Sequence, residues 1–413
     1  MELNREIVNL LTNAEDKLRD AFKEVDNLAL FNQSKVLDAF RDNAIGQRHF
    51  AGTNGYGYDD IGRDTLCKLL ARIFGTESAI VSPLIVSGTH ALSLTLFALL
   101  KHGDKMLSIS GAPYDTLQTI IKGNGNGSLA DNDIDYIQVD LIESGLDYAK
   151  IEDTLRNNKI KLVFIGRSRG YEWRNALTVS QIKKAADLVK SISPDTIVMC
   201  DNCYGEFTDY TEPTQNNVDI VAGSLIKNLG GGIAPTGGYV CGKSELIDKV
   251  ACRLTAPSIG MEVGSYASGY RTFYQGLFCA PHVVACALKS AMLFSQVFTD
   301  LGYSTLPEPS IIPSDIICSI QFETKDQAID FIRAVQKASP IDSNVVPFPW
   351  DMPGYDSQVI MAAGTFVAGA SIELSADSPL TKPYTAYIQG ALTYEHAKLA
   401  IMYCLESLSN KKG

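Results

Sequence analysis

A single lysine among glycines is the first group in this sequence that could do chemistry. Lys227 lies in the stretch GSLIKNLGGGIAPTGGYV, residues 223–240, with Ser224 before it and three consecutive glycines, 230–232, after it. A backbone without side chains lets a bulky molecule lie close to the chain, and a primary amine can bond covalently to such a molecule. The alternative is a surface lysine beside a flexible turn, which would have no chemical role.

Three further stretches carry reactive or binding side chains, each near the predicted end of a strand. Ser87, Gly88 and Thr89 open a long apolar helix, whose free N–H groups, hydroxyls and positive dipole suit a phosphate. Tyr114 stands at another helix start, where its ring could stack on a flat cofactor. Asp201 ends a very apolar strand, and a carboxylate there is costly unless it meets a cation or hydrogen-bond donors. The respective alternatives are an ordinary helix N-cap, a partly buried tyrosine and a carboxylate that caps the next segment.

The order of these groups along the chain is typical of a pyridoxal phosphate site. In such a site a lysine amine forms an aldimine with the cofactor aldehyde, and a carboxylate paired with the ring nitrogen keeps the ring electron-withdrawing. Lys227 and Asp201 are the candidates for these two roles. The helix start and Ser224 would hold the phosphate, and the glycines would let the backbone pass close to the ring. The sequence therefore predicts pyridoxal 5′-phosphate as cofactor, with Lys227 as its covalent anchor.

The elements that must position these groups alternate between helices and strands. The predicted order is a helix up to about residue 40, a helix at 65–75, and then strand 78–86, helix 88–101, strand 105–110, helix 114–123, strand 135–140, helix 148–157, strand 160–166, helix 179–193, and strands 196–202 and 219–228. Alternation with nearly continuous apolar strands predicts an α/β fold, in which helices cover both faces of a mostly parallel central sheet. Ligands of such sheets bind beyond the carboxyl ends of the strands, which is where the candidate residues fall.

The pattern changes at about Ala287, beyond which a smaller α+β domain is expected. Its predicted elements are the segments 318–323, 324–339, 369–376 and 393–409. The chain is therefore expected to comprise a helical N-terminal segment over residues 1–48, a large cofactor-binding domain over 49–286 and a small C-terminal domain over 287–413.

The composition excludes several classes of protein. The chain has 413 residues, 46% of them hydrophobic and 20% charged, and its net charge of −11 disfavours a nucleic-acid or anionic-membrane partner. No apolar run reaches the roughly 18 residues that would span a bilayer, and the charged amphipathic N-terminus does not read as a signal peptide. Nine cysteines without framework spacing indicate reduced thiols and hence a cytoplasmic protein.

Taken together, these stretches resemble fold-type-I pyridoxal-phosphate enzymes of the cysteine and methionine metabolism group. The chain is most similar to the branch of methionine gamma-lyase-like or aluminium-resistance proteins, often described as cystathionine beta-lyases. The resemblance implies the PLP-dependent transferase-like fold that aspartate aminotransferase also has. It spans most of the chain and is carried by GYGYDDIGRDTL, SGTHAL, PYDTL, RSRGY, DNCYGEF, GSLIKNLGGGIAPTGGY, YQGLFCAPHVV and QGALTYEH.

The resemblance also assigns roles to individual residues. It places Lys227 in the aldimine, Asp201 at the ring nitrogen and Tyr114 against the ring. The phosphate is assigned to Ser87, Gly88, Thr89 and Ser224. In the wider group a tyrosine of the stretch GYGYDDIGR reaches the phosphate of the neighbouring subunit, which implies Tyr56 or Tyr58 here. A homodimer with shared sites, associated further as a dimer of dimers, is therefore expected.

Two positions depart from the pattern of the family. Ile226 stands directly before the lysine, where the wider group has threonine, so one phosphate contact is missing or supplied elsewhere. Thr381 stands where related sequences often carry an arginine, which puts binding of the substrate carboxylate in doubt. Arg169, at the carboxyl end of a strand, is the substitute candidate, with a structural ion pair as its alternative. Arg63, in the tyrosine-containing stretch, is a further binding candidate.

The implied reaction is β- or γ-elimination from a sulfur amino acid such as cystathionine, methionine or a cysteine derivative. An unprotonated Lys227 amine takes the Cα proton, a thiol leaves with a proton from Lys227 or Tyr114, and hydrolysis gives a keto acid and ammonia. The same set of residues also serves transsulfuration synthases and aminotransferases, and a non-catalytic member of the fold is a remoter alternative.

Two other patterns in the sequence favour different chemistry only weakly. Residues 237–244 match the spacing of a nucleotide-binding P-loop, but the segment itself reads as a strand. Cys200 and Cys203 have redox or zinc spacing, yet they lack a helix start and a second ligand pair. No metal is expected.

Overall fold

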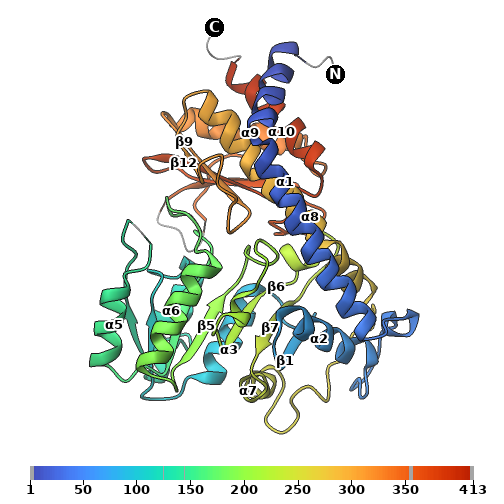
Figure 1. Cartoon of the computed structure of the whole chain (residues 1–413), viewed down its shortest axis with the longest axis vertical. Helices are drawn as coiled ribbons and strands as arrows, with labels where there is room; N and C mark the ends of the chain where they lie inside the picture. The colour runs from blue at the N-terminus through green and yellow to red at the C-terminus, as the bar shows by residue number, and fades with distance from the viewer. Residues whose placement is uncertain (1–3, 124, 144, 353–356, 410–413) are drawn as a thin grey trace.

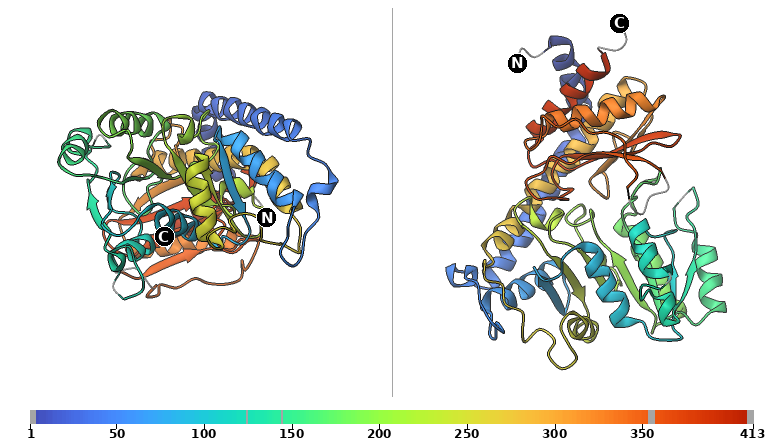
Figure 2. Two further views of the ribbon diagram at one scale, coloured as in Figure 1. Left: turned by 90° about the horizontal axis from the view of Figure 1, so that it is seen from below. Right: turned by 180° about the vertical axis from the view of Figure 1, so that it is seen from behind.

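The computed structural model describes residues 4–123, 125–143, 145–352 and 357–409. The molecule is elongated, with a large mostly parallel sheet in one half and a smaller antiparallel sheet in the other (Figure 1). Two long helices lie side by side along both halves (Figure 2).

The large sheet has seven strands in the order β1-β7-β6-β5-β4-β2-β3. Five neighbouring strands, from β3 to β6, pair in parallel, whereas β7 is antiparallel to both β1 and β6. The strands are β1 (Ser78–Ser82), β2 (Lys105–Ser108), β3 (Asp135–Gln138), β4 (Leu162–Gly166), β5 (Ile197–Asp201), β6 (Ile220–Ser224) and β7 (Gly238–Gly242). The predicted α/β class with a mostly parallel central sheet is therefore confirmed.

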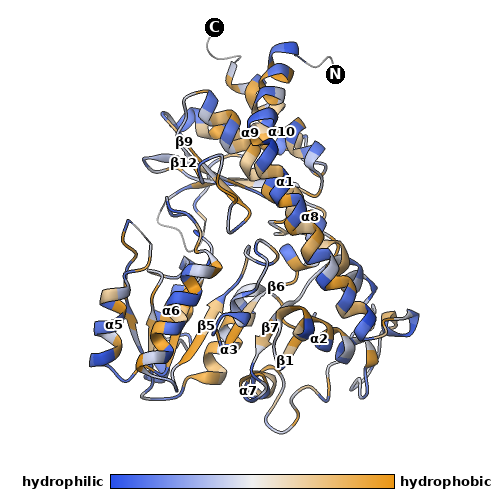
Figure 3. Cartoon of the chain, in the orientation of Figure 1, coloured by the Kyte–Doolittle hydropathy of each residue, from blue (hydrophilic) through white to orange (hydrophobic). Residues whose placement is uncertain are grey.

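Helices cover both faces of this sheet because the strands are apolar on both sides. Successive side chains alternate between faces, so Leu162 and Phe164 of β4 pack in one hydrophobic cluster while Val163 and Ile165 pack in the other. The apolar strands and the polar outer faces of the helices are visible in Figure 3. One face is covered by α3 (Gly88–Leu99), α4 (Asp115–Lys122) and α7 (Ser244–Leu254), and the other by α2 (Ile61–Phe74), α5 (Tyr148–Asn157) and α6 (Val179–Ile192). Short 3-10 helices lie at Gln47–Phe50, Ala130–Asn132, Pro213–Gln215 and Asn228–Gly230 (η4).

The small sheet has five antiparallel strands in the order β10-β11-β12-β9-β8. These are β8 (Thr305–Leu306), β9 (Ile317–Phe322), β10 (Val359–Ala362), β11 (Ser375–Pro379) and β12 (Tyr384–Gln389), packed with α9 (Lys325–Ala338) and α10 (Tyr394–Ser409). The predicted segment 369–376 mostly precedes β11, whereas β8, β10 and β12 were not predicted, because their short alternating patterns give little local signal.

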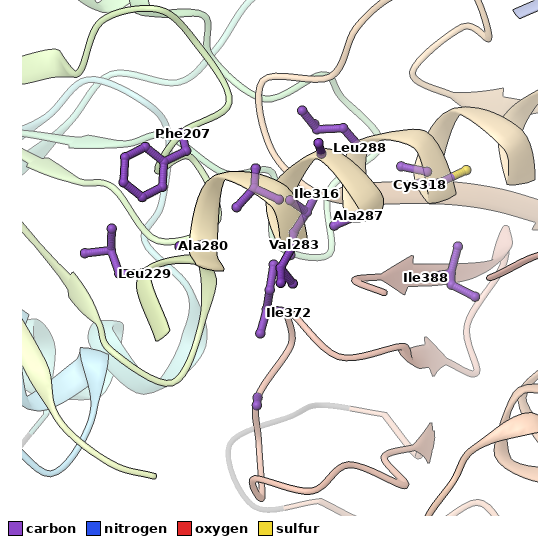
Figure 4. Packing of buried hydrophobic residues seen from close by; sticks show 14 of the residues in the cluster. Phe207, Leu229, Ala280, Val283, Ala287, Leu288, Ile316, Cys318, Ile372 and Ile388 are labelled. Atoms are coloured by element: carbon purple, nitrogen blue, oxygen red, sulfur yellow. The ribbon is translucent and has the colours of Figure 1, made fainter. Parts of the chain in front are cut away.

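The two halves share the helices α1 (Arg5–Asp42) and α8 (Arg271–Asp300). Lys17 bonds to Asp300 and Lys289 to Asp26, each at 2.6 Å, which links the two helices along their length. Figure 4 shows apolar residues of α8 between side chains from both halves, with these residues labelled: Phe207, Leu229, Ala280, Val283, Ala287, Leu288, Ile316, Cys318, Ile372 and Ile388. Ala287, where the sequence pattern changes, lies inside this continuous helix.

The apolar character of α8 corrects one expectation from the sequence. By length and composition α8 is apolar enough to cross a membrane, although the sequence had indicated no such run. Most of its apolar window is buried inside the protein, because α1 and both halves of the molecule pack around it.

Candidate active site

A cavity of about 530 Å³ lies at the carboxyl ends of β4, β5 and β6. Gly166 of β4 is paired with Asp201 of β5, and Asp201 is paired in turn with Ala222 of β6, so the ends of these strands form one row. The small sheet closes the opposite side with residues of β11 and β12. The predicted residues that line the cavity are Ser87, Gly88, Thr89, Tyr114, Arg169, Asp201, Ser224 and Lys227.

Lys227 reaches the cavity from the turn that follows β6. Its Nζ lies 3.9 Å from the ring centroid of Tyr204, within range of a cation–π interaction. Burial disfavours the charged form, but Cys203, Tyr204 and Asp201 favour it, and the net effect is to raise the pKa of Lys227. The expected unprotonated amine is that of Lys227 displaced from bound cofactor, and it stays a prediction.

Asp201 stands at the end of β5, where a fully apolar strand meets the cavity. Its Oδ1 accepts a hydrogen bond from the Cys203 N–H at 3.1 Å. Burial raises the pKa of Asp201, and the charge of Lys227 opposes that shift. A cationic partner inside the cavity would therefore stabilise this carboxylate.

The N-terminus of α3 faces the same cavity. The Ser87 hydroxyl caps the helix by accepting from the His90 N–H at 3.0 Å, which confirms the N-cap geometry. A Cβ on Gly88 would lie 3.2 Å from the Cβ of Ser224, so the helix start and the end of β6 nearly touch. Thr89 bonds to the Tyr114 hydroxyl at 2.8 Å. Hydroxyls and first-turn N–H groups thus converge at one corner, as phosphate binding requires.

These residues fit pyridoxal phosphate by their donor set. One corner offers the helix start with Thr89 and Ser224, the Tyr114 ring lies beside it, and Asp201 and Lys227 complete the wall. Burial raises the pKa of the Tyr114 phenol, and the charge of Asp201 adds to this effect. The volume is in the range of sites that hold a cofactor with a small substrate.

The glycines after Lys227 have a different purpose from the one expected. Gly231 and Gly232 adopt left-handed backbone angles, φ +53° and +72°. A Cβ on Gly231 would lie 2.5 Å from the carbonyl oxygen of Gly276 in α8. Among the described cavity-lining residues none is Gly230, Gly231 or Gly232, so the expectation that they admit the cofactor ring was wrong. Gly230 and Gly231 let the turn after Lys227 pack directly on α8.

The two arginine candidates are both held by protein groups. Arg169 lines the cavity, but its Nη2 lies 3.2 Å from Asp315 Oδ1 and its Nη1 donates to the Leu306 carbonyl at 3.0 Å. This is the geometry of the structural ion pair weighed as the alternative. Arg63 is buried outside the cavity, where it binds Asp64 and donates to the Gly57 carbonyl at 3.0 Å.

Tyr56 and Tyr58 lie outside the cavity of their own chain. They are 71% and 60% exposed, with ring centroids 5.5 Å apart. Ser265 holds their loop by donating to the Gly55 carbonyl at 2.8 Å. Two large, adjacent and exposed rings on an anchored loop are available to a second copy of the chain.

Several cavity residues were not identified from the sequence. Tyr204 has φ +70°, unusual for a non-glycine residue, and its hydroxyl bonds to Ser371 of the small half at 3.1 Å. Its place in DNCYGEF, three residues after Asp201, was the available signal. Asp377 and Gln389 come from β11 and β12, and nothing local marks them as cavity residues. Ile226, the departure before the lysine, also lines the cavity.

The weaker patterns do not form the sites that their spacing suggested. The P-loop match falls on β7, an extended strand, and its lysine, Lys243, pairs with Asp219 at 2.6 Å. Cys200 packs in the hydrophobic core, whereas Cys203 lines the cavity. All nine cysteines are free thiols, as predicted.

Comparison with known proteins covers nearly the whole chain. The family model described as Methionine gamma-lyase matches residues 7–409. The uncharacterized protein YnbB of Bacillus subtilis is 45% identical over 394 residues, which cover 94% of this chain and 93% of that protein.

Solved structures agree with this relationship. A carbon-sulfur lyase involved in aluminum resistance from Clostridium novyi NT is 48% identical, with a TM-score of 0.95 over 98% of this chain and 96% of that one. A protein of Clostridium acetobutylicum, provisionally named a cystathionine beta-lyase involved in aluminum resistance, is 44% identical with the same TM-score and coverage. The pyridoxal-5′-phosphate-dependent protein YhfS of Escherichia coli is only 14% identical, but a TM-score of 0.65 over 94% of this chain and 97% of that one shows the common fold. The expected fold type I is thereby confirmed.

Proposed function

This chain belongs to the methionine gamma-lyase family, and we propose on that premise that it is a pyridoxal-phosphate-dependent carbon–sulfur lyase. Its substrate would be a sulfur amino acid, split by β- or γ-elimination into a thiol, a keto acid and ammonia. The observation that carries the proposal is the presence of Lys227 and Asp201 in one cavity with the N-terminus of α3. The carbon-sulfur lyase of Clostridium novyi, which aligns along almost the full length, supports the same reaction class.

The cofactor would be held by groups at three places in the cavity. Lys227 would bind it covalently, and the Asp201 carboxylate would face its ring nitrogen. The Tyr114 ring would cover it, fixed by the hydrogen bond to Thr89. The phosphate would lie against Ser87, Gly88, Thr89 and Ser224.

The side chains of this protein would then orient the reaction and move protons. Bound pyridoxal phosphate supplies an electron sink for the electron pair left when Cα loses its proton. Asp201 would hold a proton on the ring nitrogen of the cofactor. The protonated nitrogen is a cation, and it would replace Lys227 as the ion-pair partner of Asp201. Lys227 would take the Cα proton. Either Lys227 or the Tyr114 hydroxyl would then donate a proton to the leaving sulfur.

A second copy of the chain would complete the site. Tyr56 and Tyr58 would reach the phosphate of the partner subunit, which explains why two large rings are exposed on an anchored loop. Arg63, bonded to the Gly57 carbonyl of the same loop, would hold that loop in place. A dimer of dimers is the assembly expected from the family.

The proposal is tested with a panel of sulfur amino acids, in which thiol and keto acid release are both measured. Release of both in equal amounts is expected, whereas keto acid formation that requires a second amino-group acceptor would indicate an aminotransferase. Borohydride reduction of the holoenzyme followed by peptide mapping should place the cofactor on Lys227. An adduct on Lys243 instead would overturn the assignment of the anchor.

A further inference from the structure

A buried carboxylate, Asp377 of β11, forms part of the cavity wall contributed by the small sheet. The residue is 7% exposed, and its Oδ2 accepts from Gln389 Nε2 at 3.3 Å. Burial raises the pKa of Asp377 to about 6, and hydrogen bonds from Tyr171 and Gln389 oppose that shift. At pH 8 the cavity therefore contains an ionised carboxylate that is bonded to neutral donors.

No cation of the described chain forms an ion pair with Asp377. Arg169 is committed to Asp315, and Arg174 binds Glu172 and donates to the Ser168 carbonyl at 2.7 Å. The third cavity arginine, Arg167, donates to Asn202 Oδ1 and to the Gly205 carbonyl, each at 2.8 Å. A buried carboxylate without a cation is unfavourable, and a carboxylate has room for more donors than two. A cationic group of a ligand would supply the missing charge.

We propose that Asp377 recognises an ammonium group on the sulfur substituent of the substrate. This inference rests on the proposed function, because in that reaction class the α-amino nitrogen bonds to the cofactor and is no longer a free cation. The ammonium group must then lie beyond the sulfur atom. The favoured substrates are thioether amino acids with a second amino group, rather than methionine or S-alkyl cysteines.

The test uses two substrates that differ only at this group, S-(2-aminoethyl)-L-cysteine and S-propyl-L-cysteine. Elimination breaks the Cβ–S bond, the Cα proton is lost, the sulfur leaves as a thiol, and one water converts the remaining enamine into pyruvate and ammonia. For the wild-type holoenzyme, kcat/KM should favour the aminoethyl substrate by between about tenfold and a hundredfold, the range of a hydrogen bond to a charged group. In Asp377→Asn the ratio should fall to near one, with the loss confined to the aminoethyl substrate.

The matched control is Glu172→Gln, which removes a cavity carboxylate that already has Arg174 as its cation. Its ratio should equal that of the wild type. Equal ratios in wild type and Asp377→Asn, or an equal loss for both substrates in Asp377→Asn, would overturn the inference.

A binding measurement separates this inference from the proposed function. L-Lysine and L-2-aminoheptanoic acid have the chain lengths of the two substrates but no leaving group, so calorimetric titration of the holoenzyme reports recognition without turnover. Tighter binding of lysine, lost in Asp377→Asn, would support the role of Asp377 even if no sulfur amino acid is cleaved. Equal binding of the two by the wild type would refute it, even if lyase activity is found.

Discussion

At the scale of single residues, the cavity contains buried charges that are stabilised only by an opposite charge beside them. Asp201 and Lys227 shift each other's ionisation, and Asp201 keeps a backbone hydrogen bond as well. Burying an isolated charge would cost several kcal/mol of folding free energy. Each of these two residues therefore needs an oppositely charged group beside it. A pyridinium nitrogen is a suitable replacement partner once Lys227 is engaged.

Replacing Asp201 by asparagine keeps the shape of the side chain but removes the negative charge. Asp201→Asn should still bind the cofactor, which its absorbance reports, yet lose at least about a hundredfold in kcat/KM, on the order of 3 kcal/mol in the barrier. The reason is that an amide does not hold a proton on the ring nitrogen. Turnover close to that of the wild type would exclude Asp201 from this role.

Glu206, directly behind the site, predicts a pH dependence of stability. It is fully buried and accepts from the Tyr239 hydroxyl at 2.6 Å. Burial raises the pKa of Glu206 to about 8, the Tyr239 hydrogen bond and the charge of Lys227 lower it, and Glu212 raises it. Between the unfolded value of 4.5 and about 8 the native state binds more protons than the unfolded state, so the free energy of unfolding falls as pH rises.

The Glu206→Gln side chain cannot ionise. As the pH rises from 4.5 to about 8, the free energy of unfolding of this variant should therefore fall less than that of the wild type. Urea unfolding at pH 5, 6.5 and 8 should give curves that diverge with rising pH, the variant being the more stable by a few kcal/mol at pH 8. If the midpoints of the two proteins stay parallel across the three pH values, Glu206 is already ionised in the native state.

At the scale of elements, close contact between α8 and η4 positions the lysine. The turn that carries Lys227 continues into η4, and Gly230 at its end and Gly231 after it lie against the backbone of Gly276 in α8. The same helix packs against strands of the small sheet, so one element ties the position of the lysine to the position of the small sheet.

Gly276→Ala tests this contact. Alanine favours a helix by about 1 kcal/mol over glycine, but its Cβ would collide with the carbonyl oxygen of Gly230. We expect a net loss of about 1–3 kcal/mol in unfolding free energy from overpacking, together with weaker binding of pyridoxal phosphate. Melting temperature and cofactor titration measure the two effects. Gly46→Ala is the control, because a Cβ there meets nothing within 4 Å; a Gly276→Ala protein as stable as this control would contradict the close contact.

At the scale of the whole molecule, the cavity has contributions from both sheets, and the tyrosine loop is exposed outside it. Asp377 and Gln389 come from the small sheet, while Asp201 and Lys227 come from the large one. Tyr56 and Tyr58 cannot serve their own cavity in this arrangement, so a two-fold assembly would create two composite sites per dimer.

Mixing two inactive parents tests this assembly. Lys227→Ala subunits combined with Tyr56→Phe, Tyr58→Phe subunits should form mixed dimers with about half the wild-type activity, because one site carries both defects and the other carries neither. Activity is measured after dissociation and reassociation of the parents, with each parent alone as control. If the tyrosines act within their own chain, no activity returns, and an active monomer in light scattering would also refute the shared site.

The sequence by itself determined the α/β architecture and most of the cofactor corner. Local patterns mark the helix cap at Ser87, the apolar strand that ends in Asp201 and the order of Ser87, Asp201 and Lys227 along the chain. The carboxyl ends of parallel strands necessarily meet at one edge of the sheet. The meeting of these side chains at one edge of the sheet was therefore predictable from the strand pattern, the order of the groups and the family resemblance.

Only the tertiary structure decided which residues from distant parts of the chain meet. Arg169 pairs with Asp315, 146 positions later, and Asp377 arrives at the cavity from β11. Packing also decides that β7 lies antiparallel between β1 and β6. It likewise decides that Gly231 contacts α8. Local patterns report burial and backbone preference but not which buried surfaces face each other, and that choice depends on how the small sheet packs around α8.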